Sequence, residues 1–352
     1  MFVQVTVESM VPAGHPLRDI KKLADEALTL LSQEIGRGYS RIGRASIPPE
    51  CLLRSQLLMA LYGISSERSF CEQLRYNMLY KWFVGLEIDE VPFVPTTFTK
   101  NRDRFMKMEV GKKLFNAIVL KASDLGLLSS EHFSVDGSLI EAAASMKSFR
   151  SKDDDDDHDG NGWADFTGTK RSNETHESTT DPESRLMRKG PGKEAKLSHT
   201  LNVLDENRNG IILAVNVVKA TGTAEREGAI DLLKATVAPR KAKATLGADK
   251  GYDAKSFIGD LRKMKIRPHV ALVNDPRRRK PSLDKRTTNS RGYQISQVSR
   301  RKIEGVIGWL KAPGRIKRTR FVGIQKTNHL AQLMAAAHNL LRIANLSRRM
   351  PA

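Results

Sequence analysis

The spacing of hydrophobic positions divides the chain into three parts. From residue 16 to residue 128, apolar side chains recur every three or four residues, as in "PPECLLRSQLLMALYGI" and "SERSFCEQLRYNMLYKWFVGL". This period places them on one face of a helix. From residue 130 to residue 273, short apolar runs of strand length alternate with amphipathic stretches. The rest of the chain is basic, and its first part, residues 274–292, is expected to be a loop. The pattern predicts a helical N-terminal part, an α/β core and basic C-terminal helices.

The α/β part predicts a mixed sheet. Residues 133–135 form the first expected strand, and residues 196–204 and 210–220 form a hairpin joined by the turn-rich link "DENRNG". A helix is expected at 223–237, a strand ending in a polar turn at 244–253, and a last strand at 267–273 after a helix that begins at residue 254. Antiparallel strands followed by strand–helix–strand order favour a mixed sheet with helices on its faces.

Two segments have more than one interpretation. The two helices on either side of the Gly-Ile-Ser-Ser turn at 63–66 fit a helix-turn-helix DNA reader and equally a plain helical bundle. Residues 151–195 are a polar insertion, and its N-terminal half includes five consecutive aspartates, Asp153–Asp157. These aspartates lack the spacing and closing glutamate of a calcium loop, so we expect a solvated loop without a catalytic role.

Composition narrows the possible partners. The chain has 352 residues, 39% of them hydrophobic, and a formal net charge of +19. Such a positive excess usually faces nucleic acid or an anionic membrane. No apolar run is long enough for a membrane span, and the N-terminal residues lack a secretory signal. We therefore expect a cytoplasmic protein that binds DNA and no membrane, with Cys51 and Cys71 as buried apolar side chains.

Three acidic residues stand where their surroundings do not favour them. Asp136 follows an apolar strand, Asp249 ends the strand "ATLGAD", and Glu304 is the single acid among twelve Lys and Arg residues between 297 and 352. An Asp at the end of a strand is more often a cap or turn former. Three convergent carboxylates, however, would form an oxygen site for Mg²⁺ or Mn²⁺, and two such ions can promote attack on a phosphodiester.

Longer motifs give these acids a family context. The stretches "FSVDGSLIEAAASMKSFR", "KRSNETHESTTDPESRLMRKGPGKEAKLSH", "ATGTAERE" and "GADKGYD" resemble the catalytic core of the DDE transposases of bacterial insertion sequences, in the insertion-sequence-five group of the insertion-sequence-four superfamily. The resemblance implies a ribonuclease-H-like mixed-sheet core over residues 129–352, with polar insertion 151–195, and a helical DNA-binding domain over residues 1–128. It also implies that Asp136, Asp249 and Glu304 are the catalytic, metal-binding triad, with two Mg²⁺ or Mn²⁺ ions per site.

The helix around the third acid carries a signature of that group: Tyr, two residues, Arg, three residues, Glu, six residues, Lys. Arg300, Glu304 and Lys311 match it in register, whereas Gln297 replaces the tyrosine. In a helix over 297–314 these residues share one face. The resemblance and the basic C-terminal composition together predict a set of DNA-binding residues: Lys250, Gln297, Arg300, Lys311, Arg315, Lys317, Arg318 and Arg320.

The function expected from the sequence is that of a transposase. It would bind the terminal inverted repeats of its own element as a homodimer on DNA, cleave phosphodiesters at the ends and join the 3′-hydroxyls to target DNA. Two alternatives stay open: a nuclease of the same fold without strand transfer, and a catalytically decayed copy that represses its element by binding DNA. The intact triad favours catalysis, and Gln297 keeps the decayed copy open.

Overall fold

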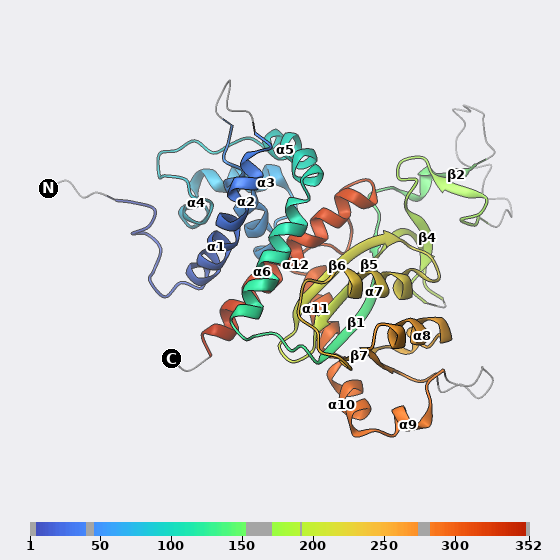
Figure 1. Cartoon of the computed structure of the whole chain (residues 1–352). Coiled ribbons are helices and arrows are strands. Elements are labelled where there is room, and N and C mark those ends of the chain that lie inside the picture. The colour runs from blue at the N-terminus through green and yellow to red at the C-terminus, as the bar shows by residue number, and fades with distance from the viewer. Residues whose placement is uncertain (1–4, 40–45, 153–170, 191, 274–281, 350–352) are drawn as a thin grey trace.

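A computed structural model describes residues 5–39, 46–152, 171–190, 192–273 and 282–349, and it begins with a group of helices (Figure 1). The predicted solvated loop with Asp153–Asp157 falls on residues outside these ranges. The helices before the sheet are α1 (Leu17–Gly36), α2 (Pro49–Leu61), α3 (Glu67–Tyr76), α4 (Met78–Val84), α5 (Thr96–Lys107) and α6 (Val110–Asp124).

Local signals fix the ends of these helices. Pro49 opens α2, where its missing N–H costs nothing. Ser66 and Asn77 cap α3 and α4, because their side-chain oxygens accept hydrogen bonds from the backbone N–H groups of Ser69 (3.2 Å) and Tyr80 (3.1 Å). Gly85 ends α4 in the left-handed conformation, at a φ of 91°. The predicted helical period is therefore confirmed in this part of the chain.

The sheet combines antiparallel and parallel strands. Its five main strands are β1 (His132–Glu141), β5 (Ala195–Glu206), β6 (Ile211–Lys219), β7 (Thr245–Ala248) and β8 (Arg267–Val270). They lie in the order β6-β5-β1-β7-β8, where β5 is antiparallel to β1 and β6, and β7 is parallel to β1 and β8. The short β4 (Arg185–Arg188) extends the edge beside β6 by pairing with the start of β5.

Helices cover both faces of this sheet. One face carries α7 (Ala224–Ala235) against β5 and β6, and α8 (Lys255–Lys263) follows against β8. The other helices are α9 (Lys285–Thr288), α10 (Arg291–Ser299), α11 (Lys302–Lys311) and α12 (Ile324–Ser347). Of these, α10 packs on β7 and β8, α11 on β1 and α12 on β6. Three antiparallel strands followed by two parallel strands, with helices on both faces, form the predicted ribonuclease-H-like core.

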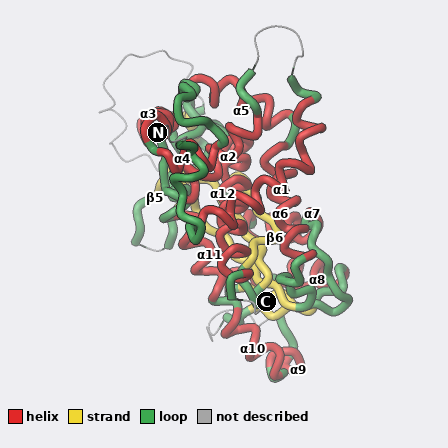
Figure 2. The backbone as a smooth tube through the Cα atoms, turned by 90° about the vertical axis from the view of Figure 1, so that its left-hand side faces the viewer, coloured by secondary structure: helices red, strands yellow, loops and turns green. Residues whose placement is uncertain are grey.

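The last helix joins the two halves of the chain. Figures 1 and 2 show α12 between the N-terminal helices and the sheet, and it packs against α1, α2 and α6 as well as β6. Its Asn339 side chain pairs with both backbone groups of Ile212, accepting from the N–H at 2.9 Å and donating to the C=O at 2.8 Å. One hydrophobic core thus runs across the predicted boundary at residue 128.

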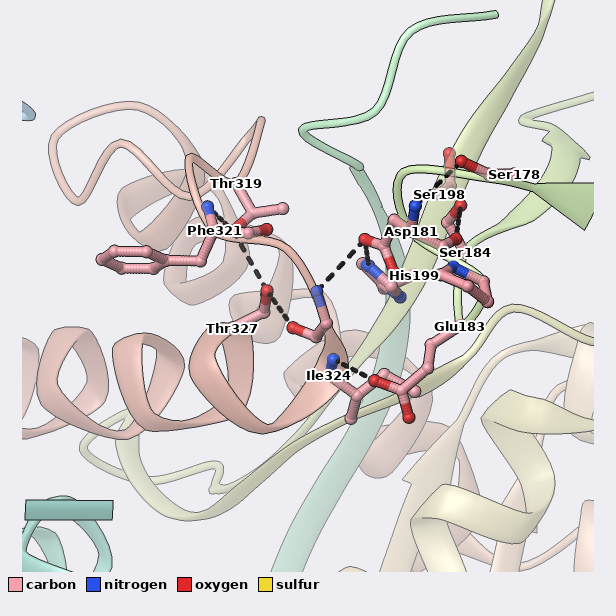
Figure 3. A network of polar contacts seen from close by, with 12 residues as sticks. Ser178, Asp181, Glu183, Ser184, Ser198, His199, Thr319, Phe321, Ile324 and Thr327 are labelled. Atoms are coloured by element: carbon pink, nitrogen blue, oxygen red, sulfur yellow. Dashed lines mark hydrogen bonds and ion pairs between the residues drawn. The ribbon is translucent and has the colours of Figure 1, made fainter. Parts of the chain in front are cut away.

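The described part of the polar insertion is tied to this core. It adds β3 (His176–Ser178), which pairs with β2 (Phe149–Ser151), just after the single turn η1 (Met146–Ser148). Figure 3 shows how the next turn reaches α12: Asp181 bonds His199 of β5 at 3.1 Å and accepts from Gly323 N at 3.3 Å. Glu183 accepts from the first N–H of α12, at Ile324, at 2.8 Å. The insertion therefore caps a helix N-terminus.

Two local predictions were wrong. Residues 297–314 were expected as one helix, but α10 ends at Ser299 and α11 begins at Lys302. A tight turn separates them, with Ile303 N bonded to Arg300 O and Glu304 N to Arg301 O. Residues 274–292 were expected as a loop, yet their described part includes α9, capped by Asp284. In the ranges that the structure describes, no helix is long and apolar enough to span a bilayer.

Candidate active site

Asp136 and Asp249 meet where the parallel pairing of β1 and β7 ends. The last paired residues of the two strands are Ser134 and Gly247, and β1 continues to Glu141 while β7 stops at Ala248. Each aspartate lies two positions beyond its strand's last paired residue, so a continued register would set them opposite each other. The ends of adjacent strands at such a point commonly form binding sites.

Asp136 is half-buried and lies near other acidic side chains. Burial raises the pKa of its carboxyl from 3.8 to about 7, although the hydrogen bond that Oδ1 accepts from Gly137 N (2.8 Å) opposes this shift. The negative charges of Asp249 and Glu225 raise this pKa further, and Arg300 lowers it. Asp249 is held by its own loop, where Oδ1 accepts from Gly251 N at 2.7 Å.

Arg300 and Lys311 stand on the same face of the sheet as Asp136. Arg300 lies over Gly247, since a Cβ built on that glycine would be 3.0 Å from the Cβ of Arg300. Lys311 donates a hydrogen bond to the hydroxyl of Ser138, two residues after Asp136 on β1. Burial lowers the pKa of this lysine, and the charge of Asp136 opposes that shift. Both cations of the signature are thus next to Asp136.

Gln297, in the place of the signature tyrosine, has a defined position. Its side-chain amide donates to the backbone oxygen of His269 in β8 at 2.6 Å. Its carbonyl oxygen accepts from Nε of Arg300 at 2.9 Å. Gln297 therefore links the sheet to Arg300 and orients the guanidinium.

Glu304 is placed differently from the two aspartates. It is exposed in the first turn of α11, and its side chain makes no hydrogen bond or ion pair with the described residues. Within those residues, no three His, Cys, Asp or Glu side chains are arranged to hold one metal ion. The structure thus brings Asp136 and Asp249 together and does not bring Glu304 to them. Its role as the third acid stays a prediction.

The sequence analysis missed two residues at this site. Glu225 begins the first turn of α7, and its charge acts on both Asp136 and Asp249. Tyr252 follows Asp249 in η3 (Lys250–Tyr252) and is fully buried, and its hydroxyl has no hydrogen-bond partner among the described residues. Glu225 lies in the quoted "ATGTAERE" and Tyr252 in "GADKGYD", but neither is an acid at an apolar strand or a single acid in a basic segment, the two patterns that indicated the triad.

The predicted DNA-binding residues fall into two groups. Lys250, Lys317 and Arg318 are exposed: Lys250 directly follows Asp249, while residues 317–319 run along the end of β1, at Glu141. Their backbone is held there because Glu141 N donates to Lys317 O at 3.0 Å. The location of these three cations is compatible with the predicted contact to phosphate.

Arg315 and Arg320 instead contact the N-terminal helices. Arg315 Nε donates to Gly63 O at 3.2 Å, and Arg320 donates to Ser65 O and pairs with Glu67 at 3.2 Å. Arg102 of α5 pairs with the same carboxylate at 2.5 Å. The turn that fits a helix-turn-helix reader is therefore packed against the core. For Arg315 and Arg320, DNA contact stays a prediction beside this intramolecular role.

The two aspartates suit a divalent cation. Their oxygens are hard ligands of the type that Mg²⁺ and Mn²⁺ prefer. Burial raises the pKa of Asp136 and the charges of nearby acids raise it further, and a bound cation would favour the ionised carboxylate. Mg²⁺ commonly binds proteins through only one or two carboxylates and keeps several waters. Asp136 and Asp249 alone are therefore enough to fit it.

Comparison with known proteins agrees with this picture. Residues 165–340, half of the chain, match the family model described as a transposase DDE domain, and residues 5–104 match a transposase domain (DUF772). No curated protein matches the chain significantly.

Three solved structures resemble the chain weakly. The piggyBac transposase synaptic complex with hairpin DNA has 10% identity and a TM-score of 0.43, covering 96% of this chain and 76% of that one. The Mos1 strand transfer complex has 10% identity and a TM-score of 0.22, covering 91% and 99%. A pre-cleavage Mos1 transpososome has 8% identity and a TM-score of 0.22, covering 97% and 100%. The strand order, not these likenesses, establishes the fold.

Proposed function

Because the chain belongs to the transposase DDE domain family, we propose that it cleaves DNA at the ends of its insertion sequence and joins the 3′-hydroxyls to target DNA. The observation that carries this proposal is the pair Asp136 and Asp249, each two residues past the last paired residues of β1 and β7, with Arg300 and Lys311 nearby. Carboxylates next to cations suit a site that must hold both divalent metal and phosphate. We place this activity in the bacterial cytoplasm.

We assign metal binding to the acidic residues of the site and phosphate binding to its cations. Asp136 and Asp249 would hold Mg²⁺ or Mn²⁺, two ions when the site is complete. Bound ions of this type lower the pKa of an attacking water or hydroxyl and stabilise the leaving oxygen. Arg300, oriented by Gln297, and Lys311 would contact phosphates of the strand that is cut. Lys250, Lys317 and Arg318 would extend this contact along the DNA.

Glu304 would complete the metal site. It lies seven residues before Lys311 on α11, which places both on one helical face about 10 Å apart along the axis. Since Lys311 reaches β1 and Glu304 has no partner in the described residues, its exposed side chain is free to turn toward the aspartates. Paired cutting at two ends would require a homodimer on DNA.

The test is cleavage and joining of labelled DNA that carries the sequences flanking the gene, with Mg²⁺ or Mn²⁺. We expect end-specific nicks and joined products from the native chain. Asp136→Asn should abolish both, whereas Asp231→Asn, an exposed aspartate on α7, should change neither. Nicks that persist in Asp136→Asn would contradict the proposed site.

Two other outcomes would select the alternatives. Nicks without joining would indicate a nuclease of the same fold. Specific binding to the ends without cleavage would indicate a DNA-binding remnant. The two hydrogen bonds of Gln297 favour an active enzyme, because they keep Arg300 in place despite the missing tyrosine.

A further inference from the structure

Glu225 lies against the strand that carries Asp136. A Cβ built on Gly137, the residue after Asp136, would be 2.4 Å from Cγ, 2.7 Å from Cδ and 2.8 Å from Oε1 of Glu225. Only a glycine leaves room for the glutamate at this position. The carboxyl group of Glu225 therefore rests on the backbone of β1, next to the catalytic aspartate.

A second glycine brings α7 this close to the sheet. A Cβ on Gly228 would be 2.0 Å from Nδ2 of Asn202, and Asn202 pairs with Gly137 across β1 and β5. The Asn202 amide also donates to Ala224 O, at the start of α7, at 3.5 Å. The two glycines, Gly137 and Gly228, thus allow the N-terminus of α7 to pack closely on the sheet, and this brings Glu225 to the site.

The packing of α7 does not account for a carboxylate at this position. Glu225 is half-buried and makes no hydrogen bond with the described residues, and it faces two other acids. Burial raises its pKa, and Asp249 raises it further. The helix N-terminus favours a negative charge, but Glu227, exposed in the same turn, meets that preference equally well.

Tyr252 provides an independent sign that something binds between these groups. Its side chain is fully buried, and its hydroxyl has no partner among the described residues. Burial raises the pKa of this hydroxyl, and the charges of Glu225, Asp136 and Asp249 raise it further, so it lies near the three carboxylates. Buried hydroxyls are rarely left without a partner. A water held by an ion between the acids would supply one.

We propose that Glu225 is a further carboxylate of the metal site, acting beside Asp136 and Asp249 through waters that the cation retains. This inference rests on the proposed function. The three side chains are not arranged to ligate one ion directly. Mg²⁺ keeps most of its waters in proteins, however, and a carboxylate can bind such a water without reaching the ion.

The test measures Mn²⁺ binding to the DNA-free full chain at pH 8 by isothermal titration calorimetry. We expect Glu225→Gln to weaken Mn²⁺ binding about 10-fold or more, as is usual when a group that binds the ligands of a metal is lost. Glu227→Gln is the matched control, since it removes the same charge from the same turn. It should change the affinity less than about 2-fold, because its charge is screened by solvent.

Two results would overturn the inference, and they differ in what else they overturn. Unchanged affinity in Glu225→Gln, with binding lost in Asp136→Asn, would overturn the role of Glu225 alone. Binding that survives Asp136→Asn would overturn the metal site of the proposed function and the inference with it. Thermal unfolding without metal separates binding from folding: Glu225→Gln should be at least as stable as the native chain, because it relieves repulsion among three acids.

Discussion

Asp136 on β1 and Asp249 just after β7 each lie two residues past the last paired residues of these parallel strands, Ser134 and Gly247. This places two carboxylates side by side at the point where β7 ends and β1 continues. Neither has an ion-pair partner among the described residues. Burial raises the pKa of Asp136 and the charge of Asp249 raises it further, and this gives the site a measurable dependence on pH and metal.

The stability of the metal-free chain should fall as the pH rises from about 4 to about 7. In this window the unfolded chain ionises Asp136, with a pKa near 3.8, while the folded chain keeps it protonated up to about 7. The full effect is at most roughly 4 kcal/mol. Thermal unfolding at several pH values checks this, with Asp136→Asn as the control that should lose this component.

Added Mg²⁺ should stabilise the protein more at pH 8 than at pH 5.5. Below a pKa of about 7 the ion must displace a proton from Asp136, and above it the carboxylate is already ionised. The same unfolding experiment with and without Mg²⁺ measures the difference. An equal shift at both pH values would mean that Asp136 does not hold the ion.

Gln297→Ala should slow DNA cleavage about 10-fold, on the order of 1.4 kcal/mol, and leave folding nearly unchanged. The variant removes the hydrogen bond that orients Arg300, but the backbone of α10 does not depend on it. Single-turnover cleavage and urea unfolding measure the two effects. Gln294→Ala, an exposed glutamine on the same helix, is the control. Equal rates in both variants would show that Gln297 does not position Arg300.

Arg320→Ala should destabilise the chain by about 1–3 kcal/mol. Its guanidinium forms an ion pair with Glu67 and lies over the ring of Phe321, 4.8 Å from the ring centre. Because Glu67 is the first residue of α3, these contacts attach α3 to the core. Chemical denaturation measures this loss.

Lys317→Ala is the informative comparison for that variant, because Lys317 is exposed. It should leave stability unchanged and reduce the salt dependence of DNA binding by about one unit of slope. Arg320→Ala with native stability and weakened DNA binding would instead assign Arg320 to the DNA.

Asp181→Ala should cost about 1–3 kcal/mol, because it leaves a ring nitrogen of a fully buried histidine without its hydrogen-bond partner. Asp181 and His199 are both 0% exposed and 3.1 Å apart, and Asp181 also accepts from Gly323 at the start of α12. Urea unfolding measures the cost, and Glu177→Ala, exposed on β3, should be neutral. A small effect for Asp181→Ala would show that α12 does not need this cap.

The sequence by itself determined the local features of the protein: its secondary-structure elements and the acidic residues at the ends of its strands. Strand and helix periods predicted the hairpin of β5 and β6, the helix α7 and the strand before Asp249, because side-chain alternation is a local property. The same patterns singled out Asp136 and Asp249, since an acid at the end of an apolar strand is conspicuous without any knowledge of its neighbours.

Only the tertiary structure decided which distant groups meet. It brought Glu225 to Gly137, paired Arg320 with Glu67, and left Glu304 exposed after a break between α10 and α11. These contacts join segments that are far apart in the chain, and they depend on how closely one element packs on another. At Gly137 and Gly228, α7 can approach the sheet closely because these residues have no side chain. The local pattern of hydrophobic and polar residues does not reveal this.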